Sequence, residues 1–148
     1  TALLPSVVSK SVPLGKAKVA LFSRLAPHKQ GLWLVKQWDF LQNYMAELHI
    51  HGGGEEESLI REYIQEKGLC DRIKCWGRYP DGQDYVNLLS SYDFTVLPTI
   101  GAEGSPLVLL ESMACGVPFV AYGVGGIHEY GFINLDVMVG RNHTSCLL

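Results

Sequence analysis

Residues 93–122, DFTVLPTIGAEGSPLVLLESMACGVPFVAY, read as a strand, a helix and a second strand. Both strands are continuous apolar runs, which is typical of strands covered on both faces of a parallel sheet. Between them, Ser105 and Pro106 form a good helix start, and Gly116 marks the end of the helix. This stretch therefore predicts one strand–helix–strand unit of an α/β fold.

The rest of the chain repeats this alternation of apolar runs and amphipathic segments. The predicted strands are residues 19–23, 47–51, 73–77, 93–98, 117–122 and 137–140. The predicted helices are residues 30–42, 55–67, 84–92 and 105–116, and Gly68 is the predicted cap of the second. Crossovers between parallel strands are right-handed, so we expect a doubly wound, Rossmann-like parallel sheet of about six strands. A ligand should bind beyond the carboxyl ends of these strands.

Composition limits the classes of function. The chain has 148 residues, of which 47% are hydrophobic and 18% charged, so we expect one folded domain with a real core. A formal net charge of −3 gives no electrostatic footprint for binding nucleic acid. The four cysteines form no CxxC pair, and we interpret them as reduced core residues of a cytoplasmic protein; they are Cys70, Cys75, Cys115 and Cys146.

Both ends of the chain look cut. It begins at Thr1 rather than Met, and it stops without a closing secondary-structure element. Residues 1–16 are rich in Pro and Ser and show no helical period, so we interpret them as a linker. We expect residues 17–148 to be one truncated domain of a longer protein.

Two glutamates interrupt the apolar segment 103–121. Glu103 is predicted to lie in a loop at the ligand-binding edge of the sheet, and Glu111 inside the following helix. Both long stripes of that helix are apolar, so we expect it to be buried nearly all round. Buried carboxylates are costly unless they are paired or used, so the pair favours a ligand site over two ordinary surface acids.

The segment EGSPLVLLESMACGVPFVA (103–121) resembles the E-x7-E signature of the retaining GT-B glycosyltransferases, especially glycosyltransferase group 1 (family 4). In that family the first glutamate lies against the donor sugar and the second holds the ribose. The resemblance therefore implies a catalytic contact of Glu103 with the sugar and a ribose contact of Glu111. The helix start between them would lie against the donor; its residues are Ser105, Pro106, Leu107 and Val108. All of these except Pro106 have a backbone N–H group to offer to the ligand. The family often has Phe-Gly where this chain has Ser-Pro, which affects the shape of the loop.

The loop after the first strand, SRLAPHK (23–29), carries a second part of the resemblance. Arg24 and Lys29 match the R-x4-K with which the family binds phosphates. Two cations at this edge can bind a diphosphate and neutralise the negative charge that develops as the nucleotide leaves, so we count both residues as catalytic candidates. Alone, they would usually be solvated surface residues.

Two further loops are weaker candidates for nucleoside binding. HGGG (51–54) is similar to the family's glycine loop, so Gly52 and Gly53 could approach the ligand closely, although a tight turn into a helix explains them equally well. GRYPDG (77–82) occupies the position where the family holds the base. Arg78 or Tyr79 could flank that base, or the loop could be a plain Pro-Asp-Gly turn.

Other motifs are given structural interpretations. The segment YGVGGIHEYG (122–131) contains the family's G-G-x-x-E pattern, but it lacks the spacing of a dinucleotide-binding site. His49 and His51 share one face of a strand, and we interpret them as satisfied core histidines rather than metal ligands.

The resemblance covers residues 17–140 and implies the carboxyl-terminal, donor-binding half of a GT-B enzyme. It implies transfer of a hexosyl group from a UDP-, GDP- or ADP-sugar, with retention and without metal or cofactor. The acceptor-binding amino-terminal domain would be a missing partner, which leaves room for peripheral membrane association through it. The isolated chain should be inactive. Two alternatives remain open: a non-catalytic Rossmann-like interaction module, and half of a sugar-nucleotide epimerase.

Overall fold

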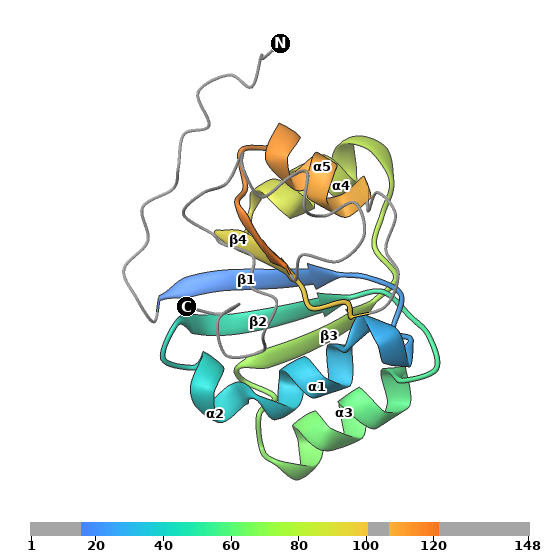
Figure 1. Cartoon of the computed structure of the whole chain (residues 1–148), viewed down its shortest axis with the longest axis vertical. Helices are drawn as coiled ribbons and strands as arrows, with labels where there is room; N and C mark the ends of the chain where they lie inside the picture. Colours follow the sequence, from blue (N-terminus) through green and yellow to red (C-terminus); the bar gives the residue numbers. More distant parts are fainter. Residues whose placement is uncertain (1–15, 101–106, 122–148) are drawn as a thin grey trace.

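A computed structural model describes residues 16–100 and 107–121 (Figure 1). Its five strands form a single parallel sheet in the order β3-β2-β1-β4-β5. The strands are β1 (Ala17–Phe22), β2 (Met45–His51), β3 (Ile73–Gly77), β4 (Phe94–Leu97) and β5 (Phe119–Ala121). The predicted α/β, Rossmann-like sheet is confirmed, with five strands in the described part. The predicted strand at 137–140 lies outside the described residues.

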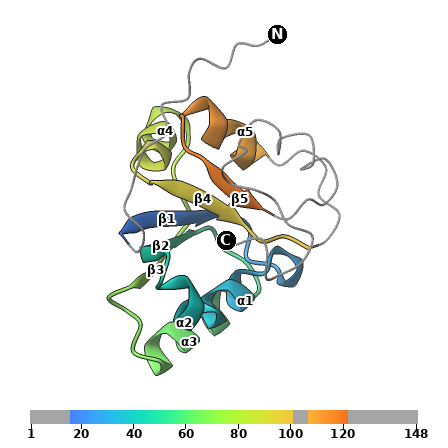
Figure 2. The ribbon, with the colours of Figure 1, turned by 60° about the vertical axis from the view of Figure 1, so that its left-hand side comes forward.

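Helices cover both faces of the sheet, as Figures 1 and 2 show. On one face lie α1 (Gly31–Lys36), α2 (Trp38–Leu41) and α3 (Glu57–Glu66). On the other face lie α4 (Gly82–Ser90) and α5 (Leu107–Ala114). The chain changes faces after β3, when it crosses back over β2 and β1 to form β4. This is the doubly wound arrangement, and it places the strand ends of β1 and β4 side by side.

The helix predicted at 30–42 is in fact two short helices. They meet at Gln37, whose φ of −90° and ψ of 12° lie outside the helical region. The bend lets α1 bury Leu34 and Val35 while α2 turns Trp38 and Leu41 into the same core. A short 3₁₀ helix, η1 (Pro27–Lys29), precedes them.

Glycines end two helices as the sequence predicts. Gly116 has a φ of +70°, its N–H bonds the carbonyl of Met113, and the N–H of Val117 bonds the carbonyl of Ser112. The same pair of bonds follows α3 around Gly68, which has a φ of +66°. Both are Schellman caps, which need the left-handed conformation that glycine adopts without strain.

The expected all-round burial of the helix at 105–116 is wrong. Along α5 the buried residues are Leu109, Ser112 and Met113, whereas Leu107 is 69% exposed and Glu111 is exposed. Periodicity could not tell which apolar stripe packs on the sheet. The stripe that contains Ser112 packs on the sheet, because the Ser112 hydroxyl forms hydrogen bonds with the Thr95 hydroxyl and the Val117 carbonyl inside the core.

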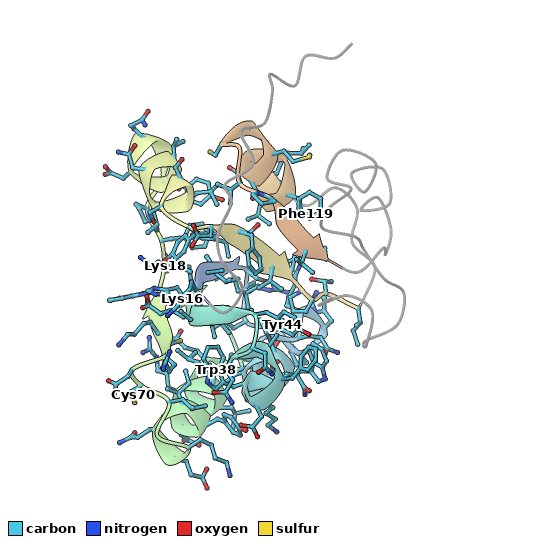
Figure 3. All side chains as sticks on the ribbon, turned by 90° about the vertical axis from the view of Figure 1, so that its left-hand side faces the viewer. Lys16, Lys18, Trp38, Tyr44, Cys70 and Phe119 are labelled. Atoms are coloured by element: carbon cyan, nitrogen blue, oxygen red, sulfur yellow. The ribbon has the colours of Figure 1, made fainter. Side chains whose placement is uncertain are left out.

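The interpretation of the cysteines as core residues is wrong for Cys70, whereas Cys75 and Cys115 pack against the edge of the core. Cys70 is exposed in the loop before β3 (Figure 3), and Cys75 and Cys115 are half-buried. All three are free thiols, and burial raises the pKa of Cys75 above its ordinary value. Cys146 lies outside the described residues. No helix in the described part of the chain is long and apolar enough to span a membrane.

Candidate functional site

Backbone hydrogen bonds join the loops that follow β1, β2 and β3. The N–H of Ser23 bonds the carbonyl of His51, and the N–H of Leu25 bonds that of Gly53. The N–H of Gly52 in turn bonds the carbonyl of Gly77. These loops lie at the carboxyl ends of parallel strands, which is the edge where α/β sheets bind ligands.

Gly52 has a structural role in this arrangement. Its φ is +129°, and a Cβ atom there would overlap the carbonyl oxygen of Ser23. Gly54, with a φ of +152°, approaches the backbone of Leu25 in the same way. Only glycine permits this contact between the two loops, which keeps the loop after β1 close to the sheet.

A cavity of about 640 Å³ opens at this edge. Its lining includes Arg24 and Lys29 from the loop after β1, Tyr79 from the loop after β3, and Leu107, Val108 and Glu111 from α5. The structure thus brings together six of the residues that the sequence singled out. Gly52 and Gly53 lie in the loop after β2 and Arg78 in the loop after β3, but they are not part of the lining, and their ligand contacts stay predictions. Glu103, Ser105 and Pro106 fall outside the described residues.

The loop after β1 supplies the positive charge of the cavity. Arg24 is exposed, and Lys29 is half-buried at the end of η1. The N–H of Lys29 bonds the carbonyl of Ala26, and the N–H of Ile100 bonds the carbonyl of His28. The second bond ties this loop to the segment after β4, so both basic side chains start from an anchored backbone.

Glu111 is held from the neighbouring helix. The hydroxyl of Tyr85, on α4, donates a hydrogen bond of 3.1 Å to its Oε1 atom. Burial of the ring, followed by the charge of Glu111, raises the pKa of Tyr85 well above its ordinary value. Tyr85 therefore keeps its proton and remains a donor throughout the neutral pH range.

Aromatic rings form the wall between these charges. Tyr79 stacks on Tyr85 with ring centroids 5.4 Å apart and meets Phe22 edge-on at 5.1 Å. Tyr85 also meets Phe22 edge-on. Tyr79 is still 38% exposed, so its ring can contact a planar group in the cavity.

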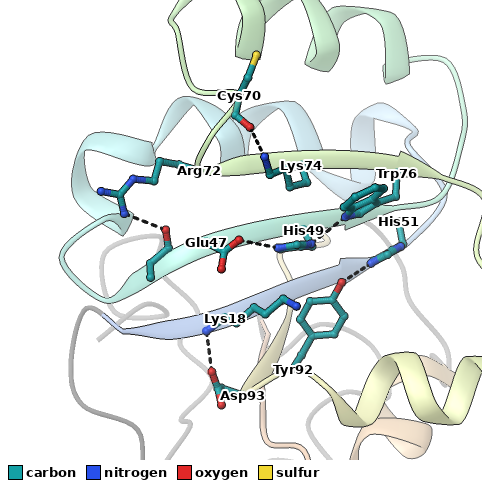
Figure 4. Close-up of polar contacts among 11 residues, drawn as sticks. Lys18, Glu47, His49, His51, Cys70, Arg72, Lys74, Trp76, Tyr92 and Asp93 are labelled. Carbon is teal, nitrogen blue, oxygen red and sulfur yellow. Dashed lines mark hydrogen bonds and ion pairs between the residues drawn. The ribbon is translucent and has the colours of Figure 1, made fainter.

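The two histidines of β2 are satisfied core residues, as predicted (Figure 4). His49 Nδ1 accepts a hydrogen bond of 2.8 Å from Trp76 Nε1, and its Nε2 lies 3.2 Å from Oε1 of Glu47. His51 Nε2 lies 2.6 Å from the Tyr92 hydroxyl. Within residues 16–100 and 107–121, no group of three His, Cys, Asp or Glu side chains could hold a metal ion.

Sequence reasoning missed several residues of the cavity. Phe22, His28, Asp81 and Tyr85 all line it. Tyr85 had a recognisable signal, because it shares the buried stripe of α4 with Leu89, where a tyrosine hydroxyl needs a polar partner. No signal in the sequence identified its partner, Glu111, which lies 26 residues further along the chain.

The cavity combines three kinds of contact. Two cations can bind an anion such as a phosphate, a carboxylate can accept hydrogen bonds from hydroxyl groups, and an aromatic face can stack on a planar ring. These contacts suit a ligand that has an anionic group, a polyhydroxylated group and a planar group.

Comparison with known proteins matches this chain to glycosyltransferases. A family model described as "Glycosyl transferases group 1" matches residues 16–141. The 2-deoxystreptamine N-acetyl-D-glucosaminyltransferase of Streptomyces fradiae is 30% identical over 151 residues, covering 95% of this chain and 34% of the relative. The GDP-mannose-dependent monoacylated alpha-(1-6)-phosphatidylinositol monomannoside mannosyltransferase of Corynebacterium glutamicum is 33% identical over 119 residues, covering 75% of this chain and 30% of the relative.

Solved structures agree with these matches. Anabaena HepE in complex with UDP and glucose has a TM-score of 0.66 and 26% identity, covering 78% of this chain and 32% of that one. The pneumococcal O-GlcNAc transferase GtfA in complex with UDP and GlcNAc has a TM-score of 0.62 and 26% identity, covering 75% and 21%. This chain spans about a third of the length of the first relatives it matches.

Proposed function

Because this chain belongs to the glycosyl transferases group 1 family, we propose that its cavity binds the nucleoside diphosphate of a nucleotide-sugar donor. The observation that carries the proposal is one cavity lined by Arg24, Lys29, Tyr79 and Glu111, which come from two loops and a helix. Each residue type suits a different part of such a donor.

Arg24 and Lys29 bind the diphosphate in this proposal. Their charges oppose the negative charge that grows on the leaving nucleotide as the bond to the sugar breaks. Backbone N–H groups at the start of α5, near Leu107 and Val108, add donors for the same oxygens. These groups take the place of a metal ion, so donor binding should not require one.

Glu111 and Tyr79 bind the nucleoside. The Glu111 carboxylate accepts hydrogen bonds from the ribose hydroxyls, and the Tyr79 ring lies against the base. Glu103 then contacts the sugar, as the family resemblance implies.

The reaction proposed for the full-length protein is transfer of a hexosyl group to an acceptor with retention of configuration. A second domain would supply the acceptor site, since the relatives are about three times as long as this chain. UDP is the first nucleotide to test, because the similar structures of HepE and GtfA were each solved in complex with it.

The test is isothermal titration calorimetry with UDP, GDP and ADP, each with and without EDTA. Binding of one of them with a Kd between micromolar and millimolar, about 4–8 kcal/mol, and unchanged by EDTA, is the expected result. Absence of binding to all three would overturn the donor-site proposal. Loss of binding with EDTA would overturn its metal independence.

A further inference from the structure

Tyr85 has no direct role in the function proposed above, yet its hydroxyl contacts the residue assigned to the ribose. The ring is buried on α4, and the hydroxyl reaches across to Oε1 of Glu111 on α5 at 3.1 Å. Glu111 is otherwise exposed at the cavity wall. An exposed glutamate on a helix samples several rotamers, and restricting it costs conformational entropy each time a ligand binds.

We propose that Tyr85 is a positioning residue that holds Glu111 in its ribose-binding rotamer and thereby makes the cavity select ribonucleotides over deoxyribonucleotides. This inference rests on the proposed function, because it takes Glu111 as the ribose ligand. It adds a residue from a different helix and a specific consequence for ligand choice.

The geometry supports a positioning role for Tyr85. Its ring is fixed on two sides, by Tyr79 stacked at 5.4 Å and by Phe22 edge-on at 5.4 Å. A ring held in this way directs its hydroxyl to one place. The donor itself persists, because Tyr85 keeps its proton at neutral pH.

The hydrogen bond also leaves Glu111 able to bind hydroxyls. Tyr85 uses one lone pair of Oε1, so the other Oε1 lone pair and both of Oε2 can still accept. The carboxylate is thus oriented before the ligand arrives, and the cost of ordering it is not taken from the binding energy. A ligand without ribose hydroxyls gains nothing from this arrangement.

The experiment compares Tyr85→Phe with the unchanged full-length protein, titrated with UDP and with 2′,3′-dideoxy-UDP. Phenylalanine keeps the ring contacts and removes only the hydroxyl. We expect the Kd for UDP to rise about three- to tenfold and the Kd for dideoxy-UDP to change by less than about twofold. In a Glu111→Ala background, the same Tyr85→Phe change should leave the Kd for UDP unaltered.

Tyr92→Phe is the matched control, because Tyr92 belongs to the same buried aromatic cluster but its hydroxyl lies on His51. It should leave the ratio of the two Kd values unchanged. If Tyr85→Phe raises the Kd values for UDP and dideoxy-UDP by the same factor, Tyr85 has a merely structural role and the inference is overturned. The inference is also overturned if Tyr85→Phe changes neither Kd value. If the unchanged protein binds none of UDP, GDP and ADP, the proposed function itself fails. If it prefers UDP to dideoxy-UDP and Tyr85→Phe keeps that preference, only this inference fails.

Discussion

The Tyr92 hydroxyl lies 2.6 Å from Nε2 of His51, at the point where α4 gives way to β4 and β2 comes to its end. Both side chains are buried, and the His51 ring stacks on Phe22 with centroids 4.6 Å apart and planes 8° apart. Burial lowers the pKa of His51 from 6.5 to about 4, and the charges of His49 and Lys18 act in the same direction. The imidazole therefore stays neutral in the folded protein at neutral pH.

Stability should accordingly fall in mild acid. The unfolded chain takes up a proton at His51 below pH 6.5, whereas the folded chain resists it down to about pH 4. The free energy of unfolding is thus fully retained above about pH 6.5 and should decline by on the order of 2–3 kcal/mol toward pH 4. Urea unfolding at a series of pH values across this window measures the decline.

His51→Gln should reduce the slope of this pH dependence, because the titrating group is gone. A stability that is flat between these pH values in the unchanged protein would contradict the neutral, buried state of His51. His49, whose pKa burial also lowers, should contribute part of the slope that remains in His51→Gln.

The contact between Gly52 and Ser23 predicts an unequal cost of adding a methyl group at two glycines. Gly52→Ala would place Cβ against the Ser23 carbonyl at a φ of +129°, whereas Gly68→Ala meets open space at a φ of +66°. Gly68→Ala should cost about 1 kcal/mol of unfolding free energy, the ordinary penalty of a left-handed residue. Gly52→Ala should cost at least about 2 kcal/mol more, since the backbone must move. Equal losses in urea unfolding would contradict the close approach.

The fold was predictable because its signals are local. The buried strands are apolar runs, and glycines at 68 and 116 sit where two helices end. The break at Gln37 was not predictable, because residues 30–42 keep a continuous amphipathic pattern across it. The bend places Trp38 in the same buried cluster as Leu34 and Val35, and such tertiary packing leaves no local signal in the sequence.

The site was predictable only in part, because only some of its signals are local in the sequence. Arg24, Lys29 and Glu111 stand out as charges at strand ends or within an apolar helix, and topology alone brings such positions to one edge. The bond between Tyr85 and Glu111 depends on how two helices pack side by side, and no local pattern encodes that. The roles of Gly52 and Gly53 were ambiguous because a close approach to a ligand and to a neighbouring loop need the same residue.

Arg24 should contribute to binding through phosphate alone. Arg24→Ala is expected to weaken binding of UDP by about 1.5–3 kcal/mol, the usual value of a hydrogen bond to a charged group. Binding of uridine, which lacks phosphate, should be unaffected. Calorimetry with both ligands at two salt concentrations checks this, and the salt dependence for UDP should become weaker in the variant. Arg72→Ala removes the same charge at the start of β3, away from the cavity, and should change neither titration.

Substitution of Glu111 and substitution of Glu103 should have different effects on UDP binding and on turnover. If Glu111 holds the ribose, Glu111→Ala should weaken binding of free UDP by about 1.5–3 kcal/mol, because a charged hydrogen-bond acceptor is lost. If Glu103 addresses only the sugar, Glu103→Ala should leave UDP binding nearly intact while turnover of the full-length protein falls. Glu62→Ala, at an exposed position of α3, should affect neither. Titration of each variant with UDP, followed by kcat for sugar transfer, separates the two roles, and equal loss of UDP binding from both cavity glutamates would contradict this division.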